Sequence, residues 1–353
     1  MNTKSNNSLP DAIPAALWPL LGLASFAIRL VLGWTYWGGA SRRLIYDQLK
    51  LDPSSHAYLA NKLVHAAPGA AFDITPIMHW LLHQPTLLHI AIISFTLLEL
   101  IVGVGLMLGF ATRILSIGGM GLAIVLMIIF GWMGTTCLDE WTMAATGFAM
   151  AAVTFITGGG WYSLDRVFFG NNANQSAKLA WLTSGPLPLS GRQYVRFSTI
   201  MAVISIVFTV GFYGYNFGAL VTPLGKRVNN VHPSIALSQG TLQGQTVKVN
   251  TYMITGPDTQ GVYITHVAID NGSAQVASYS SADLKQASQL KLTNEFAPYS
   301  TCKAVDYAVR CQLGSKATWQ FQLPKQTVID TTKPVKLVMT DVEGKQYQIN
   351  LKD

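Results

Sequence analysis

The sequence contains few charged residues. Asp, Glu, Lys and Arg make up 12% of its 353 residues, about half the share that is usual in soluble domains. Hydrophobic residues make up 50%, which indicates a membrane protein. The apolar runs stop near residue 220, and no later run approaches the roughly 20 apolar residues that a spanning helix needs. We therefore expect a membrane part followed by a water-soluble part.

Several cofactor and nucleic-acid signatures are also missing. The sequence has no Walker pattern, no other nucleotide-binding loop and no c-type haem attachment motif. Its net charge is +7, but neither half holds a dense basic run, so a nucleic-acid partner is not indicated.

The membrane part is predicted to be an α-helical bundle of four helices, followed by a fifth spanning helix. The bundle would occupy residues 1–170, and a polar linker with the fifth helix would occupy residues 171–220. The predicted spans are residues 18–40, 87–110, 114–133, 141–157 and 197–220.

Residues 221–353 are predicted to form an all-β, sandwich-like domain. Short β-branched runs with partial alternation recur there, and Gly256, Pro257 and Asp258 mark a turn between two of them. Short strands at such spacing favour an antiparallel sandwich. The predicted strands are residues 246–255, 261–270, 304–313, 317–323, 335–340 and 347–351.

Loop charges predict the orientation, because positive residues concentrate on the cytoplasmic side. With a cytoplasmic N-terminus, Arg113 and residues 166–196 face the cytoplasm and the β domain lies outside. Arg42, Arg43, Lys50 and Lys62 oppose this assignment. If it is right, these outer cations are candidates for binding an anion.

Two of the three cysteines lie nine residues apart in the β domain. Cys302 and Cys311 favour a disulfide, which needs an oxidising compartment. A structural metal site is less favoured, because two thiols lack the further ligands that zinc requires.

The third cysteine lies between two apolar runs, beside carboxylates. Cys137, Asp139 and Glu140 would place a thiol next to groups that move protons. The alternative is an inert cysteine with acids that stabilise the start of the next helix, where negative charge is favoured.

Two arginine patterns also allow two interpretations each. Arg42 and Arg43 follow the first span, where they would either reach to the membrane surface or form a fork for an oxyanion. Arg29 and Glu99 lie inside apolar runs, where opposite charges usually pair. They predict either a structural ion pair or a proton path and quinone contact.

Histidines near the second span give a weaker signal. His79 and His83 share a helix face at i, i+4 spacing, and His89 follows. A metal site would need a third ligand, whereas Trp80 and its apolar neighbours favour an interfacial helix. No metal site is predicted.

A set of short motifs runs in order through residues 17–170. It comprises Gly33-Trp34, Gly38-Gly39 with Arg42-Arg43, Leu51–Ser54, Asn61–His65, Glu99–Gly103, Gly109–Arg113, Phe130–Trp132, Thr136–Trp141 and Tyr162–Asp165. This ordered set resembles the DoxD family, and the C-terminal half resembles DoxA. The two families are the large and small subunits of thiosulfate:quinone oxidoreductase, so the chain looks like a fused form.

The resemblance implies oxidation of thiosulfate to tetrathionate, with electrons passed to a ubiquinone-type membrane quinone. Because haem and flavin motifs are missing, a cysteine would carry the redox chemistry, as a disulfide or a thiosulfonate adduct. The candidate site residues are Cys137, Asp139 and Glu140 as catalytic groups, Arg42, Arg43 and His65 for substrate, and Arg29, Glu99 and Trp141 for quinone.

The resemblance also implies a location. It predicts a multi-pass protein of the bacterial inner membrane, with the β domain on the periplasmic side. A homo-oligomer stays open. Two other functions also stay open, namely a non-enzymatic assembly or partner-binding protein and a transporter of sulfur oxyanions.

Overall fold

The structure is a computed structural model that describes residues 13–133, 139–169, 181–216, 231–324, 327–330 and 332–352. It divides into two compact units. The helical unit comprises Met1–Asp52, His89–Ile128 and Glu140–Gly225, and the β unit comprises Pro53–Leu88, Ile129–Asp139 and Lys226–Asp353. The β unit therefore includes two segments that precede residue 140. The division at residues 170 and 220 stays a prediction.

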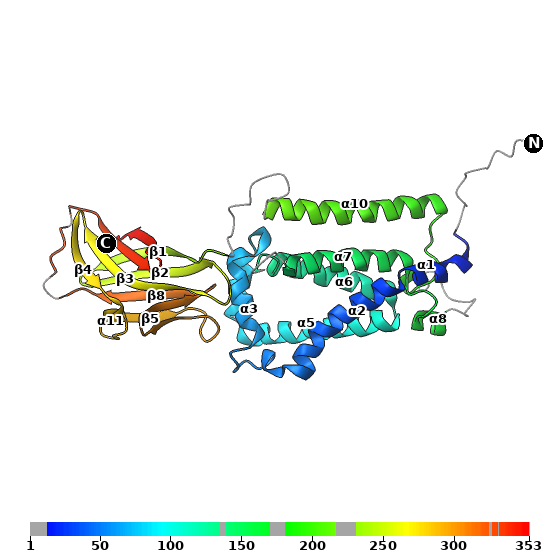
Figure 1. Ribbon diagram of the computed structural model, residues 1–353, viewed down its shortest axis with the longest axis horizontal. Helices are drawn as coiled ribbons and strands as arrows, with labels where there is room; N and C mark the ends of the chain where they lie inside the picture. The colour runs from blue at the N-terminus through cyan, green and yellow to red at the C-terminus, as the bar shows by residue number, and fades with distance from the viewer. Residues whose placement is uncertain are drawn as a thin grey trace, which may run out of the picture. The chain divides into compact units, whose positions relative to one another are not determined.

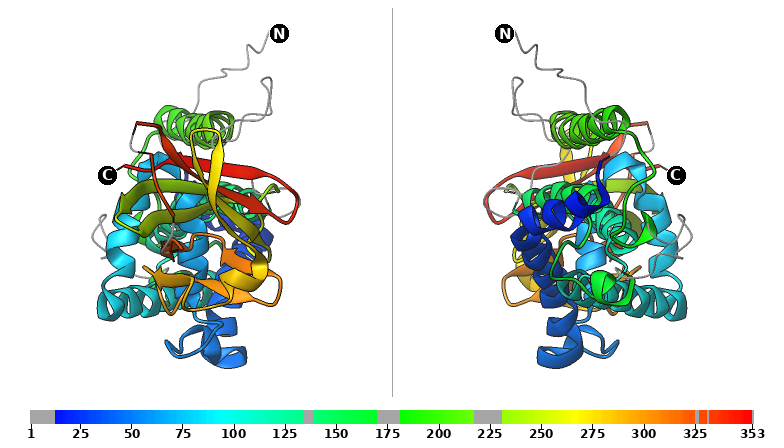
Figure 2. Two further views of the ribbon diagram at one scale, coloured as in Figure 1. Left: turned by 90° about the vertical axis from the view of Figure 1, so that its left-hand side faces the viewer. Right: turned by 90° about the vertical axis from the view of Figure 1, so that its right-hand side faces the viewer.

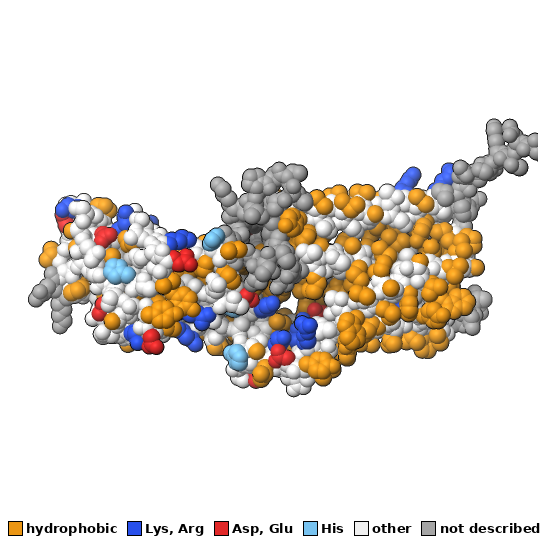
Figure 3. Space-filling view, in the orientation of Figure 1, with side chains coloured by type: hydrophobic (Ala, Val, Ile, Leu, Met, Phe, Trp, Pro, Cys, Tyr) orange, Lys and Arg blue, Asp and Glu red, His pale blue; other side chains and the backbone are white. Residues whose placement is uncertain are grey.

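The helical unit is built from helices (Figure 1). Three helices are long and apolar enough to cross a membrane, and a bent pair raises the number to four if it counts as one span. Hydrophobic side chains cover much of these helices on the face shown in Figure 3. The long helices are α5 (Pro85–Leu108), α6 (Thr112–Ile129) and α10 (Gly191–Asn216), and the shorter α7 (Asp139–Thr157) and α8 (Leu164–Phe169) lie between α6 and α10 in the chain.

The first predicted span is broken. Helix α1 (Trp18–Ala24) meets α2 (Phe26–Ser41) and the π-helix Arg42–Tyr46 at an angle of 57°. At the break, the Ser25 hydroxyl lies 2.6 Å from the Thr157 hydroxyl at the end of α7. A β-carbon at Gly22 would lie only 2.2 Å from the backbone of Gly160. The bend therefore brings two backbones into a contact that only glycine permits.

The core of the helical unit is small and apolar. Leu32 and Tyr36 of α2 pack with Val102 and Leu106 of α5, together with residues of α6 and α7. Helix α10 contributes little to this core, because only 6% of its apolar segment is buried. The end view in Figure 2 shows it at the margin of the helices. It packs on α7 through aromatic pairs such as Phe148 with Phe208.

The β unit contains two antiparallel sheets, which confirms the all-β prediction. One has the order β1-β2-β8-β5, and the other has the order β10-β9-β3-β7-β6 with β4 beside β3. The strands are β1 (Ser234–Gln243), β2 (Thr246–Thr255), β3 (Gly261–Asn271), β4 (Ala274–Tyr279), β5 (Leu290–Asn294), β6 (Cys302–Val305), β7 (Ala308–Gln312), β8 (Lys316–Gln322), β9 (Val335–Asp341) and β10 (Gln346–Asn350).

Alternating side chains form the core of the sheets. Val247, Val249 and Met253 of β2 are fully buried, and so are Trp319 and Phe321 of the neighbouring β8. A period of two places these residues on one face of the sheet. The sequence did not predict β1, β4 or β5, and it joined β6 and β7 into one strand.

Two helices from the N-terminal half belong to the β unit. They are α3 (Leu59–Ala66) and α4 (Thr75–Leu82). The 3-10 turn Ala67–Gly69 lies against β2. A β-carbon at Gly314, before β8, would lie 2.0 Å from the Val64 carbonyl oxygen of α3. Glycine at this position lets the helix end and the β8 turn touch.

Candidate functional site

The helical unit buries an ion pair. Arg43 donates through Nη1 to a carboxylate oxygen of Glu99 and, at 3.0 Å, to the hydroxyl of Thr96 on α5. The side chains of Arg43 and Glu99 are 14% and 5% exposed. Thr96 in turn donates to the Ile92 carbonyl. An unpaired charge among apolar helices would cost several kcal/mol. Here each charged group has the other as its partner, and Thr96 adds a further hydrogen bond.

Gly39 keeps room beside this pair. A β-carbon at Gly39 would lie 3.3 Å from Oε1 of Glu99 and 3.6 Å from Nη2 of Arg43. A larger residue at position 39 would therefore crowd the Glu99 carboxylate, whereas its contact with Arg43 would be an ordinary one.

Arg29 does not pair with Glu99. Its Nη1 donates to the Leu106 carbonyl at 2.6 Å, and its Nη2 donates to the Tyr162 carbonyl at 2.6 Å. Arg29 is fully buried and binds the C-terminal end of α5, where carbonyls lack helical partners. A structural role for Arg29 agrees with these contacts, but the partner differs from the one that the two apolar runs suggested.

The Gly109–Arg113 and Tyr162–Asp165 motifs meet at the start of α6. Asp165 accepts hydrogen bonds from the backbone N–H groups of Ala111 and Thr112 and from the hydroxyls of Thr112 and Ser184, at 2.5–3.0 Å. It therefore acts as the cap of α6 from another helix. Arg113 is fully buried and donates to the carbonyls of Phe155, Trp181 and Gly185.

The predicted catalytic residues lie at the start of α7 or just before it. Cys137 lies outside the described residues, and for Asp139 and Glu140 the structure describes only the backbone at the start of α7. Trp141 is 5% exposed and packs against Phe212 and Tyr213 of α10, with ring centroids 6.2 and 4.9 Å away. Trp141 thus contributes to the packing of α7 on α10.

In the β unit, the Phe130–Trp132 motif is fixed beside His65. The indole N–H of Trp132 donates to the Ala66 carbonyl at 2.8 Å, and a β-carbon at Gly69 would overlap the indole ring. Nε2 of His65 is buried and has no hydrogen-bond partner among the described residues. Burial lowers the pKa of His65, and Lys62 lowers it further, whereas Asp258 acts in the opposite direction. The imidazole is thus neutral at pH 7, with one nitrogen available.

Arg42, which was also predicted to bind the substrate anion, is exposed at the start of the π-helix. It belongs to the helical unit, whereas His65 belongs to the β unit. Among the predicted site residues, the structure brings together Arg43 and Glu99.

Cys302 and Cys311 form a disulfide, in agreement with their spacing. They are directly opposite each other on β6 and β7, and their residues are 1% and 0% exposed. Asn294 accepts from the Cys302 N–H at 2.7 Å and donates to its carbonyl at 3.1 Å. The hydroxyl of Ser315 lies 3.5 Å from the Cys302 sulfur. The burial of both cysteines and the hydrogen bonds around Cys302 are typical of a structural disulfide.

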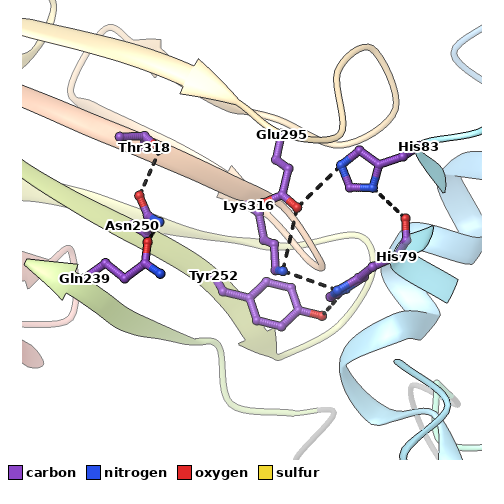
Figure 4. Close-up of polar contacts among 8 residues, drawn as sticks. All are labelled: His79, His83, Gln239, Asn250, Tyr252, Glu295, Lys316 and Thr318. Atoms are coloured by element: carbon purple, nitrogen blue, oxygen red, sulfur yellow. Dashed lines mark hydrogen bonds and ion pairs between the residues drawn. The ribbon is translucent and has the colours of Figure 1, made fainter. Parts of the chain in front are cut away.

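Sequence reasoning missed a polar cluster on α4 (Figure 4). Nε2 of His79 lies 3.3 Å from the Tyr252 hydroxyl, and Nδ1 lies 3.3 Å from Nζ of Lys316. Glu295 lies 3.6 Å from Nε2 of His83 and 3.8 Å from Lys316. These five residues, called the α4 cluster, come from four segments of the chain, so only the histidine spacing was visible in the sequence.

The surroundings of His79 in the α4 cluster keep its imidazole neutral at pH 7. Burial lowers the pKa of His79 to about 4, and the electrostatic effects of Lys316 and His83 act in the same direction. Burial also raises the pKa of Tyr252, and the charge of Glu295 raises it further. His79 is therefore neutral at pH 7, so that it accepts from Lys316 and donates to Tyr252. Within the described ranges, no group of three His, Cys, Asp or Glu side chains could hold a metal ion.

Two family models match the chain. Residues 25–190 match the model described as TQO small subunit DoxD, and residues 217–350 match the model described as TQO small subunit DoxA. The two matches follow each other without overlap and together cover most of the chain. Both descriptions use the term small subunit, whereas the resemblance had assigned DoxD to a large subunit. No solved structure matches the chain.

Proposed function

The chain belongs to the DoxD and DoxA families, fused in one polypeptide, and from this premise we propose that it oxidises thiosulfate to tetrathionate and passes the electrons to a membrane quinone. Two thiosulfate dianions join through one new S–S bond and release two electrons. A quinone supplies the matching acceptor, since it takes up two electrons and two protons. The observation that carries the proposal is the presence of both TQO family regions in one chain.

The buried pair in the helical unit fits a quinone head group by the chemistry of its donors. Arg43 can donate a hydrogen bond toward a carbonyl oxygen, Thr96 holds the Arg43 guanidinium, and Glu99 is an acid within the span α5. Gly39 carries no side chain beside the Glu99 carboxylate. We therefore assign Arg43 to orientation, Thr96 to the positioning of Arg43, and Glu99 to holding the proton. Ionisable groups inside a bundle commonly mark proton paths.

This assignment changes the expected role of Arg43. Its charge is balanced by Glu99, so Arg43 is a poor ligand for a free dianion. Arg42 remains exposed and keeps the role of a thiosulfate ligand that its sequence position suggested. Arg29 and Trp141 are assigned to packing, because their contacts are with backbone carbonyls and with α10.

The sulfur chemistry is assigned to Cys137. Cys302 and Cys311 are paired with each other and buried, which leaves Cys137 as the third thiol of the sequence. His65 is the proposed base, because it is neutral and its Nε2 lacks a partner among the described residues. Its neighbour Ala66 binds Trp132, five residues before Cys137 in the chain.

The Cys137 proton moves to His65. The thiolate sulfur then forms an S–S bond with the outer sulfur of thiosulfate, and the two electrons released by this oxidation pass to the quinone. The outer sulfur of a second thiosulfate then attacks the outer sulfur of the adduct. Tetrathionate leaves and the thiolate is restored. Asp139 and Glu140 are proposed to exchange the proton with water.

Variants in purified membranes test this scheme. We expect Cys137→Ser to abolish quinone reduction with thiosulfate, and Glu99→Gln to reduce it strongly. Glu343→Gln, an exposed carboxylate in the β unit, is the control and should leave the rate unchanged. Full activity of Cys137→Ser would overturn the role of the thiol. Uptake of labelled thiosulfate into vesicles without quinone reduction would instead identify a transporter.

A further inference from the structure

Helix α4 has two different faces. Its inner face is fixed to the sheets of the β unit, because Met78 and Leu82 are 3% and 4% exposed and His79 contacts Tyr252 and Lys316. The ring of His79 also lies 5.0 Å from the ring of Phe296. These contacts set the rotation of the helix about its axis, so the opposite face cannot turn inward.

The opposite face is apolar and exposed. Ile77 is 65% exposed and Trp80 is 56% exposed, and Phe72, just before the helix, is 55% exposed. Ile77 and Trp80 are three residues apart and therefore lie on the same side of the helix. We call the side chains of Ile77 and Trp80 the outer α4 face. Large apolar side chains gathered on one surface mark a site of interaction with a protein or a membrane.

The position of α4 in the chain shows which partner this face meets. Helix α5 begins at Pro85, three residues after the end of α4, and it is the most apolar candidate span. The link is compact, since Gln84 N–H donates to the Leu81 carbonyl and Leu88 N–H donates to the Gln84 carbonyl. Three residues reach at most about 10 Å. A span that starts at Pro85 therefore keeps α4 at the boundary of the bilayer.

We propose that the outer α4 face is a lipid-contact surface, which lies in the interfacial layer of the bilayer while the inner face holds the sheets. Tryptophan is enriched at this depth, because its ring is apolar and its N–H stays hydrated. An amphipathic helix with such a face lies in the plane of the interface. The helix would thus anchor the β unit to lipid, in addition to the covalent connection through α5.

Spin labels in the full chain test this proposal. Ile77→Cys and Trp80→Cys are each made on a Cys137→Ser background, so that only the introduced thiol reacts, and the protein is reconstituted in phosphatidylcholine nanodiscs. The matched control is Val342→Cys, which is 58% exposed on the β9–β10 turn of the same unit. Collision with oxygen reports lipid, and collision with a water-soluble nickel chelate reports water.

We expect the oxygen-to-nickel accessibility ratio at residues 77 and 80 to be several-fold higher than at residue 342. High nickel accessibility at all three positions would overturn the proposal, because the face would then be in water. Low accessibility to both reagents at residues 77 and 80 would also overturn it, because another protein surface or a second copy would then cover the face. Unchanged thermal unfolding of each variant confirms that α4 has remained folded.

Discussion

Nζ of Lys316 lies 3.3 Å from Nδ1 of His79, although the two residues are 237 positions apart in the chain. The lysine belongs to strand β8 of the DoxA region and the histidine to helix α4 of the DoxD region. The compact β unit is therefore built from both family regions. Fusion in one chain provides one DoxD region for each DoxA region, so that every β8 strand has an α4 helix to contact.

The first prediction concerns the pH dependence of this contact. The pKa of His79 in the folded protein is about 4, below the usual 6.5 of an unfolded histidine. Between pH 4 and pH 6.5 the unfolded state therefore binds more protons than the folded state. The contribution of His79 to stability is complete above pH 6.5 and is lost progressively as the pH falls toward 4. The protection of the α4 amides from hydrogen exchange, relative to the intrinsic exchange rate at each pH, should fall over this range.

Substitution of His79 separates this effect from general acid unfolding. In His79→Gln the protection of the α4 amides, relative to the intrinsic exchange rate, should depend less on pH between 6.5 and 4. The matched control is His266→Gln, an exposed histidine of β3 that contacts Ser278. A steep pH dependence that persists in His79→Gln and disappears in His266→Gln would contradict the assignment.

Much of the β unit was accessible from the sequence, because strand alternation is a local signal. Strands β2 and β3 begin where the sequence predicted, and β8 and β9 lie within one residue of their predicted starts. Strand β1 was missed because Ser238, Gln239 and Gly240 interrupt its apolar pattern. Strand β5, Leu290–Asn294, was missed because it is short and mostly polar.

The sequence could not predict which residues pair with the charged and titratable side chains. Glu99 and Arg29 both lie inside apolar runs, which made them the obvious pair. The π-helix after α2 instead brings Arg43 back toward α5, 56 residues away in the chain. In the same way, nothing local to His79 indicates Tyr252 or Lys316. Long-range contacts depend on the fold and leave no periodic pattern.

The second prediction concerns the Arg43–Glu99 pair. Removal of one member of a buried pair leaves an uncompensated charge, at a cost of about 3–5 kcal/mol. Arg43→Met alone should therefore destabilise the protein strongly, as measured by unfolding in detergent. The double variant Arg43→Met/Glu99→Leu should recover most of the loss. Additive losses in the double variant would mean that the two residues do not interact.

The third prediction concerns the disulfide. Its loop spans a sequence separation of 9, for which the loss of chain entropy corresponds to about 3 kcal/mol. The double variant Cys302→Ala/Cys311→Ala should unfold at a lower temperature but keep its quinone-reduction rate per folded molecule. A folded variant without activity would show that this disulfide takes part in the reaction.

The fourth prediction concerns Asp165 as the cap of α6. Asp165→Ala removes the acceptor for two backbone N–H groups and two hydroxyls, so a loss of at least about 2 kcal/mol is expected. Asp165→Asn retains an acceptor oxygen and should lose less. Equal stability of Asp165→Ala and the unchanged protein in thermal unfolding would rule out the cap.

The central claim is that the chain couples thiosulfate oxidation to quinone reduction. Its most direct test is the stoichiometry of the reaction in purified protein, with thiosulfate, tetrathionate and quinol measured in the same sample. We expect two thiosulfates to be consumed for each tetrathionate and each quinol formed. Quinol formation without tetrathionate, or no thiosulfate-dependent quinol formation at all, would contradict it.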